Sequence, residues 1–336
     1  MNEYKEIRSG TIKSAFIAFI IQFFISTFFI ISMAAGSGCS GGGGGGEIPG
    51  RPAEPAVKIN KVYGICFSPY MDGQAPGQEI SEVQIIERLR LIAPYTEWIR
   101  TYGCSGGLEK TGRAAKKLGL KTALGAWIGP DAAANEVEIA NLIAAALKGE
   151  ADIVIIGNET LSGASPSVTE ERLINYIRRV RAAVPPSVTV TCAEGAEALL
   201  AHPAVIDECG AVFVQIHPYW GGIPVERAVA DLSVTYEKVK AAAGGKNVVL
   251  SEAGWPDGGA ANGAAAPSPE NASLYLKNLV AWSRANKVEA FIFSAYDEAW
   301  KAGTEPNSVG SHWGLFYANG TLKPYLIDIF DGGGSL

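Results

Sequence analysis

Histidine and cysteine are scarce in this 336-residue chain. It contains three histidines and five cysteines, with no Cys-x-x-Cys pair and no Cys/His spacing typical of a zinc site. Zinc sites, and the metal-dependent amidohydrolase barrels, need several such side chains. We therefore expect no metal site and no cofactor. Four of the five cysteines, Cys66, Cys104, Cys192 and Cys209, could in principle pair. Each lies in or beside a different expected strand, so we expect mostly buried thiols.

Basic charge is sparse as well. Lys plus Arg number 28 against 34 Asp plus Glu, which gives a net charge of −6, and no basic run exceeds two residues. Binding to a phosphate backbone depends on clustered positive charge, so we expect no nucleic-acid partner. The chain is 48% hydrophobic, which excludes disorder for most of it and permits a large core.

Only one long hydrophobic run is present, at residues 15–35, and basic residues precede it. Such a run predicts an export signal or a membrane anchor. The small residues Gly36-Ser37-Gly38 then lead into Cys39, which resembles a bacterial lipoprotein signal with Cys39 lipidated, although Gly36 stands where such signals prefer Leu or Val. Three alternatives stay open, namely a lipoprotein, an uncleaved anchor and a released protein. Each one places the remainder outside the cytoplasm, attached to the cell envelope or secreted.

Composition divides the chain into four parts. We expect residues 1–38 to be the signal or anchor, 39–56 a Gly/Pro-rich linker, 57–330 a single folded domain, and 331–336 a disordered tail.

Short apolar runs alternate with amphipathic helical stretches throughout the expected domain. Eight runs occur, with starts 24 to 42 residues apart, the length of a strand plus a helix. The runs are Val62–Phe67, Glu97–Tyr102, Lys121–Trp127, Asp152–Gly157, Ser187–Cys192, Ala211–His217, Asn247–Glu252 and Glu289–Ala295. This alternation predicts a (β/α)8 TIM barrel. A doubly wound open sheet is the alternative, but no GxGxxG turn follows the first run.

The active site of such a barrel lies at the carboxyl ends of its strands. Glu159 and Glu252 stand at the ends of the fourth and seventh runs, and these strands lie across the barrel mouth from each other. A carboxylic acid that protonates a leaving oxygen, paired with a carboxylate that attacks an anomeric carbon, is the apparatus that cleaves glycosidic bonds. The distance between the two groups, which distinguishes retaining from inverting enzymes, stays open at this point.

Five of the seven tryptophans also lie at or after strand ends. Indole faces suit the C–H faces of sugar rings, while carboxylates and amides suit hydroxyl groups. The expected substrate-binding residues are Tyr70, Tyr102, Trp127, Asn158, Tyr219, Trp255, Asp297, Glu298, Trp300, Lys301 and Trp313.

Four strand-end motifs resemble glycoside hydrolase family 17, which contains β-1,3-glucanases and fungal glucanosyltransferases. The motifs are Ile156-Gly157-Asn158-Glu159, Ser251-Glu252-Ala253-Gly254-Trp255-Pro256, Tyr296-Asp297-Glu298-Ala299-Trp300-Lys301 and Ser311-His312-Trp313-Gly314-Leu315-Phe316. The resemblance implies a retaining mechanism on a (β/α)8 barrel, with Glu159 as acid/base and Glu252 as nucleophile.

The same resemblance assigns supporting residues. It implies that Glu298 and Lys301 form a pair beside the nucleophile, that Asn158 bonds the sugar 2-hydroxyl or holds the nucleophile, and that Tyr219 orients the nucleophile. Ala253 departs from the family, where Thr or Ser is usual, and Tyr296 stands at a Phe-type position.

Plainer interpretations compete with some of these assignments. Glu159 alone would suit an ordinary carboxylate at the start of a helix, and Glu298 with Lys301 would suit a surface pair three residues apart. His217 and His312 are expected to be ordinary loop histidines.

We expect a monomeric, retaining glycoside hydrolase that cleaves β-1,3-glucan polysaccharide or oligosaccharide. The alternatives are a transglucosylase that uses the same site, a glucan-binding surface protein without turnover, and a related barrel hydrolase that acts on β-1,4-glucan or mannan.

Overall fold

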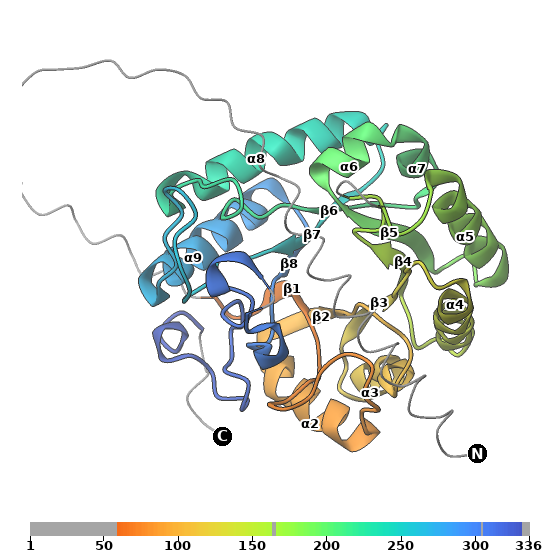
Figure 1. Cartoon of the computed structure of the whole chain (residues 1–336), viewed down its shortest axis with the longest axis horizontal. Helices are drawn as coiled ribbons and strands as arrows, with labels where there is room; N and C mark the ends of the chain where they lie inside the picture. The colour runs from red at the N-terminus through yellow and green to blue at the C-terminus, as the bar shows by residue number, and fades with distance from the viewer. Residues whose placement is uncertain (1–58, 163–165, 304, 331–336) are drawn as a thin grey trace, which may run out of the picture.

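The computed structural model describes residues 59–162, 166–303 and 305–330. The expected signal or anchor, the linker, Cys39 and the tail lie outside these residues. Among the described residues, eight parallel strands close into a barrel in chain order, with β8 beside β1 (Figure 1). The predicted (β/α)8 barrel is therefore confirmed. The strands are β1 (Val62–Cys66), β2 (Thr96–Arg100), β3 (Lys121–Ala126), β4 (Ile153–Asn158), β5 (Thr189–Gly195), β6 (Val212–Gln215), β7 (Val248–Ala253) and β8 (Ala290–Ile292).

Helices surround the outside of the barrel (Figure 1). Two short helices rather than one connect β5 to β6, because Pro203 begins a new helix immediately after the first one ends. The helices are α2 (Glu82–Ile92), α3 (Thr111–Lys117), α4 (Ala132–Leu147), α5 (Glu170–Ala183), α6 (Ala196–Ala201), α7 (Pro203–Glu208), α8 (Val225–Ala242) and α9 (Pro269–Asn286). Short 3-10 turns lie at Ala93–Tyr95, Leu108–Lys110, Ala299–Lys301, Pro306–Ser308 and Pro324–Leu326.

Side chains at the helix starts explain several of these boundaries. Ser81, Asp131, Thr169 and Ser268 each accept a hydrogen bond from a backbone N–H in the first turn of α2, α4, α5 and α9. Such caps satisfy N–H groups that have no partner within the helix.

The bounds of most strands differ from their expected runs, and two of the differences bear on the site. β5 extends to Gly195, so Glu194 lies within the strand. β8 has only three residues, because the backbone beyond it bonds to a returning segment: the N–H of Ser294 donates to the carbonyl of Trp313, and that of Leu315 to the carbonyl of Ser294. This returning segment thickens the barrel wall beside the mouth.

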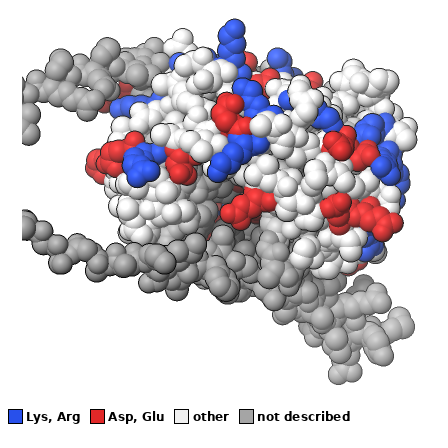
Figure 2. Space-filling view, turned by 90° about the horizontal axis from the view of Figure 1, so that it is seen from above, with Lys and Arg blue, Asp and Glu red and all other residues white. Residues whose placement is uncertain are grey.

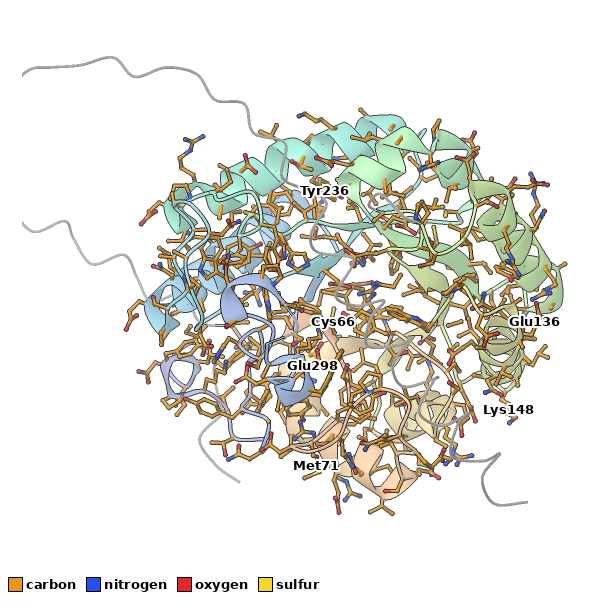
Figure 3. The ribbon with its side chains drawn as sticks, viewed as in Figure 1. Cys66, Met71, Glu136, Lys148, Tyr236 and Glu298 are labelled. Carbon is orange, nitrogen blue, oxygen red and sulfur yellow. The ribbon has the colours of Figure 1, made fainter. Side chains whose placement is uncertain are left out.

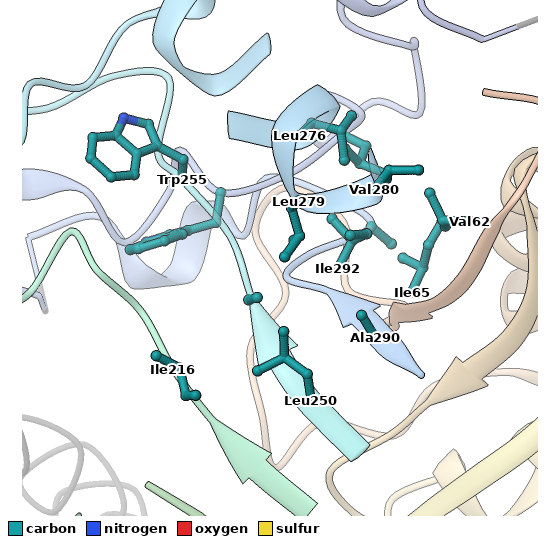
Figure 4. Close-up of a cluster of buried hydrophobic side chains, with 14 of the residues drawn as sticks. Val62, Ile65, Ile216, Leu250, Trp255, Leu276, Leu279, Val280, Ala290 and Ile292 are labelled. Atoms are coloured by element: carbon teal, nitrogen blue, oxygen red, sulfur yellow. The ribbon is translucent and has the colours of Figure 1, made fainter. Parts of the chain in front are cut away.

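Apolar side chains fill both sides of the barrel wall. The interior cluster contains Phe213 and Phe291 together with small residues such as Ala123 and Ala193. A larger cluster lies between the strands and the helices, and Figure 4 shows Leu250 of β7 and Ile292 of β8 directed toward Leu279 of α9. Burial on both faces explains why the strands appear as continuous apolar runs in the sequence.

Charge on the outside is mixed. Figure 2 shows Lys and Arg interspersed with Asp and Glu over the visible face, as the balanced composition suggests. Within the described ranges, no helix is both long and apolar enough to span a bilayer.

Gly64 provides a test of the interior packing. A Cβ at this position would lie 2.3 Å from a ring carbon of Phe291, so we expect Gly64→Ala to lower the free energy of unfolding by about 1–3 kcal/mol through overpacking. Urea denaturation measures the change. Gly129→Ala is the control, because a Cβ there has no neighbour closer than 3.8 Å. Equal losses in the two variants would contradict the packing argument.

Candidate active site

Polar side chains converge at the carboxyl ends of the strands. Glu252 is the penultimate residue of β7, and Glu159 directly follows β4. Figure 3 shows Cys66 and Glu298 near the barrel axis, whereas Glu136 and Lys148 lie at the periphery. Glu252 and Glu159 therefore lie at the same end of the barrel, one near the end of β7 and the other directly after β4.

Glu252 is held by three donors. Its Oε1 accepts hydrogen bonds from Arg100, in an ion pair, and from Nε2 of Gln215 at 3.0 Å, while Nε2 of His217 lies 3.4 Å from Oε2. Burial alone would raise the pKa of Glu252, but the charge of Arg100 and the contact with His217 outweigh it and lower the pKa to about 2. The carboxylate is therefore ionised at neutral pH.

Asn158 joins the two carboxylate-bearing strands. Its Oδ1 accepts a hydrogen bond from Nη2 of Arg100 at 2.5 Å and another from Nε2 of Gln215 at 2.6 Å. These are the same two side chains that bind Glu252. The shared donors place the end of β4, and with it Glu159, beside the Glu252 carboxylate.

Glu159 has the opposite electrostatic environment. Burial raises the pKa of Glu159 to about 8, and the negative charges of Glu252 and Glu194 add to the shift, although Arg100 opposes it. Glu159 is therefore mostly protonated at neutral pH while Glu252 is ionised. Two carboxyl groups whose pKa values are driven apart in this way provide one acid and one nucleophile or base.

A buried carboxylate anchors the turn that carries Glu159. Glu194, 1% exposed, accepts hydrogen bonds from the backbone N–H groups of Thr160 at 2.7 Å and Leu161 at 3.1 Å, and from the hydroxyl of Ser162 at 3.1 Å. Glu159 itself has a φ of 52°, which side-chain-bearing residues seldom adopt. The bonds to Glu194 help to hold this conformation.

A second charged group follows β8. Nζ of Lys301 lies 2.7 Å from Glu298 and 3.9 Å from Glu305, and all three side chains are at most 14% exposed. Burial alone would lower the pKa of Lys301, but the two carboxylates outweigh it and raise that pKa. The interpretation of Glu298 and Lys301 as an exposed surface pair is therefore wrong. Trp300 donates from Nε1 to Glu298 at 3.3 Å, which joins an indole to this group.

A scan against protein families matches residues 64–314 to the BtgE/BtgC glycoside hydrolase domain. The chain belongs to this family. The match covers most of the barrel, including Glu159, Glu252 and the group around Lys301.

Individual relatives of this BtgE/BtgC-family chain agree. A glucan 1,3-beta-glucosidase of Candida albicans is 27% identical over 263 residues, which cover 71% of this chain and 84% of that protein. One from Arthroderma benhamiae is 30% identical over 252 residues, or 66% and 77% of the two chains. The crystal structure of a glycoside hydrolase family 17 β-1,3-glucanosyltransferase from Rhizomucor miehei superimposes with a TM-score of 0.70 at 25% identity, over 80% and 97% of the chains. The resemblance to family 17 is confirmed.

Several residues expected to bind substrate in this BtgE/BtgC-family domain are used for packing instead. Tyr219 is fully buried, and its hydroxyl donates to the carbonyl of Ala260 at 2.8 Å, so it does not orient Glu252. Trp255, 4% exposed, donates from Nε1 to the carbonyl of Ala266. The expectation that these two side chains face the sugar is corrected, because their polar groups bind backbone carbonyls.

Asp297 also differs from the expectation, and Trp313 lies behind the residues of the site. Asp297 accepts hydrogen bonds from the backbone N–H of Gly314 and from Nζ of Lys323, both at 2.9 Å, so it anchors the returning segment. Trp313 is 4% exposed and packs edge-on against His217, with ring centroids 5.3 Å apart. Trp313 therefore supports the wall behind His217.

The remaining expected residues stay at the mouth. Tyr102, Trp127 and Trp300 are partly exposed, and Tyr70, 8% exposed, packs edge-on against Trp300. Asn158, Glu298 and Lys301 belong to the networks described above.

Five residues of the site were missed by the sequence analysis, or given an ordinary role there. They are Arg100, Glu194, Gln215, His217 and Glu305. Arg100 and Gln215 carry the signal that identified Glu252, a polar side chain at the end of a buried strand. The expectation that His217 is an ordinary loop histidine is wrong, because it contacts Glu252.

The ion pair between Arg100 and Glu252 generates a stability prediction. Arg100→Met leaves a buried carboxylate without its cation, so we expect the free energy of unfolding to fall by about 3–5 kcal/mol. Adding Glu252→Gln should recover part of this loss, because it removes the uncompensated charge. Urea titration followed by tryptophan fluorescence measures both variants. Arg178→Met, which breaks the exposed pair with Glu208, is the control and should change stability little. If Arg100→Met were as stable as Arg178→Met, the argument would be refuted.

Proposed function

We propose that this chain is a retaining glycoside hydrolase that cleaves β-1,3-linked glucan by double displacement, with Glu252 as nucleophile and Glu159 as acid/base. The observation that carries the proposal is the pair of carboxyl groups at one barrel mouth whose pKa values are driven in opposite directions, to about 2 and about 8. Glycosidases need one carboxyl group in each state at the same pH.

In the first step, the Glu252 carboxylate attacks the anomeric carbon, and the bond from that carbon to the leaving oxygen breaks. The proton of Glu159 passes to the leaving oxygen, and a glycosyl ester of Glu252 forms. Arg100, Gln215 and His217 direct the attacking carboxylate.

In the second step, Glu159 removes a proton from water, whose oxygen attacks the anomeric carbon and releases Glu252. The electrostatics favour this change of role. The negative charge of Glu252 contributes to the raised pKa of Glu159, and that charge disappears when the ester forms. The pKa of Glu159 therefore falls in the intermediate, and the acid becomes a base.

The rim of the mouth suits a sugar chain. Tyr102, Trp127 and Trp300 offer partly exposed aromatic surface, while Asn158 and the pair of Glu298 and Lys301 offer hydrogen-bonding groups. Aromatic faces beside such groups match the C–H faces and hydroxyls of glucose. The choice of β-1,3-glucan is supported by the names of the relatives and by a Rhizomucor miehei glucanosyltransferase mutant in complex with laminaritriose, 25% identical with a TM-score of 0.70.

Transglucosylation is the second candidate. It is favoured by the structural match to the Rhizomucor miehei β-1,3-glucanosyltransferase. A sugar hydroxyl would then replace water in the second step, with the same two glutamates. Mass analysis of products from laminarin oligosaccharides separates the two reactions, because products longer than the substrate indicate transfer.

We also propose that the enzyme works outside the cytoplasm and attached to the cell envelope. The apolar run at residues 15–35 and the small residues before Cys39 support export with lipidation of Cys39, or a helical anchor. A cell surface mannoprotein of Candida albicans, 27% identical over 260 residues, adds support for a surface location. Monomeric state stays a prediction.

Replacing the two glutamates should have different effects on activity when the leaving group of the substrate is changed. Glu159→Gln should lower kcat/KM on a β-1,3-glucan oligosaccharide by about 10²–10⁴-fold, but much less on a dinitrophenyl glucoside, whose leaving group needs no proton. Glu252→Gln should abolish turnover of both substrates. Glu138→Gln, which also alters a buried carboxylate bound to backbone N–H groups, is the control. An equal loss of kcat/KM on both substrates for Glu159→Gln would show that Glu159 is not the acid. NMR of the first anomer released should show retention.

The pH profile provides a separate prediction. The alkaline limb of kcat/KM should follow the deprotonation of Glu159, and the acidic limb the protonation of Glu252. Glu194→Gln removes a negative charge that raises the pKa of Glu159, so the alkaline limb should move to lower pH. Glu138→Gln should leave that limb in place. An alkaline limb that stays put or moves upward in the Glu194 variant would show that Glu194 does not act on the acid.

A further inference from the structure

Two thiols face each other on the outer side of the barrel, away from the mouth. Cys192 lies on β5, and Cys209 directly follows α7; their sulfur atoms are 3.7 Å apart. Both side chains are buried, at 0% and 4% exposure, in the apolar layer between the strands and the helices. The other two described cysteines have different surroundings: the sulfur of Cys66 donates to the carbonyl of Ser251, and Cys104 precedes α3.

The two thiols differ in acidity, because the pKa of Cys209 is lowered and that of Cys192 is raised. The hydrogen bond with the Cys192 thiol lowers the pKa of Cys209 to about 7, although burial opposes this shift. Nζ of Lys246 donates to the backbone carbonyl of Cys209 at 2.9 Å, which places a positive charge close by. The lowered pKa favours the thiolate of Cys209, which is the reactive form.

The elements that carry the two sulfurs are held in place independently. β5 is paired with β4 and with β6, while α7 packs against α5 and α6. A disulfide needs a sulfur–sulfur distance of about 2.0 Å, so the two atoms have to approach by about 1.7 Å. Small rotations of the two side chains would shorten this distance, because each sulfur already has the other as its neighbour.

We propose that Cys192 and Cys209 form an intramolecular disulfide when the chain matures in an oxidising compartment, and that this bond fastens the end of α7 to β5. The oxidant is a small or protein disulfide. The Cys209 thiolate attacks one of its sulfur atoms, and the other sulfur leaves as a thiol. Cys192 then loses its proton and attacks Cys209 within this mixed disulfide, which releases the second thiol. Two thiols of the chain are oxidised, one external disulfide is reduced, and both protons end on the released thiols.

The bond would stabilise a defined part of the fold. It joins residues 17 apart, so it restricts the unfolded chain over α6 and α7. Cys192 is also two residues from Glu194, whose carboxylate anchors the turn after Glu159. One end of the disulfide, Cys192, therefore lies on the strand that also carries Glu194, and its side chain faces the helices.

Peptide mapping of the full chain tests the proposal. The reduced protein is incubated with oxidised glutathione, and free thiols are then alkylated. Trypsin leaves both cysteines in one peptide, because no Lys or Arg lies between Arg181 and Arg227, so this peptide should weigh two hydrogens less and carry no alkyl group. Cleavage after Glu194 and Glu208 separates the two cysteines, and the fragments should stay joined until a reductant is added. Two alkylated thiols, a stable glutathione adduct or a bond to Cys66 would each overturn the proposal.

Thermal unfolding provides an independent readout. The oxidised chain should melt about 5 °C higher than the reduced chain, since closing a loop of this size constrains the unfolded state. Cys192→Ser should abolish the difference between oxidised and reduced samples. Cys104→Ser is the matched control, since it also alters a buried thiol, and it should keep the difference. A difference that persists in Cys192→Ser, or one absent from the unsubstituted chain, would contradict the proposed bond.

Discussion

The buried ion pair between Arg100 and Glu252 is the interaction on which the rest of the site depends. It joins β2 to β7 across the mouth, and it keeps one carboxylate ionised in surroundings that would otherwise protonate it. The charge retained on Glu252 then helps to raise the pKa of Glu159. One cation therefore governs both carboxyl groups. Further hydrogen bonds help to offset the cost of burying this pair, and here Asn158 accepts one from Arg100 while Gln215 donates one to Glu252.

The two carboxyl groups are supported in different ways, which match the roles proposed for them. Glu252 is within a strand, so the barrel itself fixes its backbone. Glu159 follows a strand in an unusual backbone conformation, and the bonds from the next residues to Glu194 hold that conformation. A nucleophile benefits from a rigid strand. An acid that also serves as a base benefits from a turn at the rim, where both the leaving group and the incoming water have access.

Side chains alternate between the two faces of β5, so this strand contributes both to the interior of the barrel and to the layer under the helices. Ala193 belongs to the cluster inside the barrel, whereas Cys192 belongs to the cluster under the helices. Glu194, at the end of the same strand, reaches the turn after β4. Chemistry on the helix side, at the two thiols, is therefore separated from chemistry at the mouth by the barrel wall, although only a few residues lie between them.

The barrel and the two glutamates could be predicted from the amino-acid sequence, because buried parallel strands appear as apolar runs and the residues that end them lie at one rim. The neighbours that act on these glutamates could not be predicted in this way, because they come from distant parts of the chain. Arg100 and Glu252 are 152 residues apart, and the direction of a strand-end side chain depends on packing that spacing does not record. The same reason explains why Tyr219 and Trp255 were expected at the substrate but are buried. The sequence places a residue at the rim of the barrel, but it does not show which way the side chain turns. In the folded chain, Tyr219 and Trp255 turn so that their polar atoms donate to backbone carbonyls.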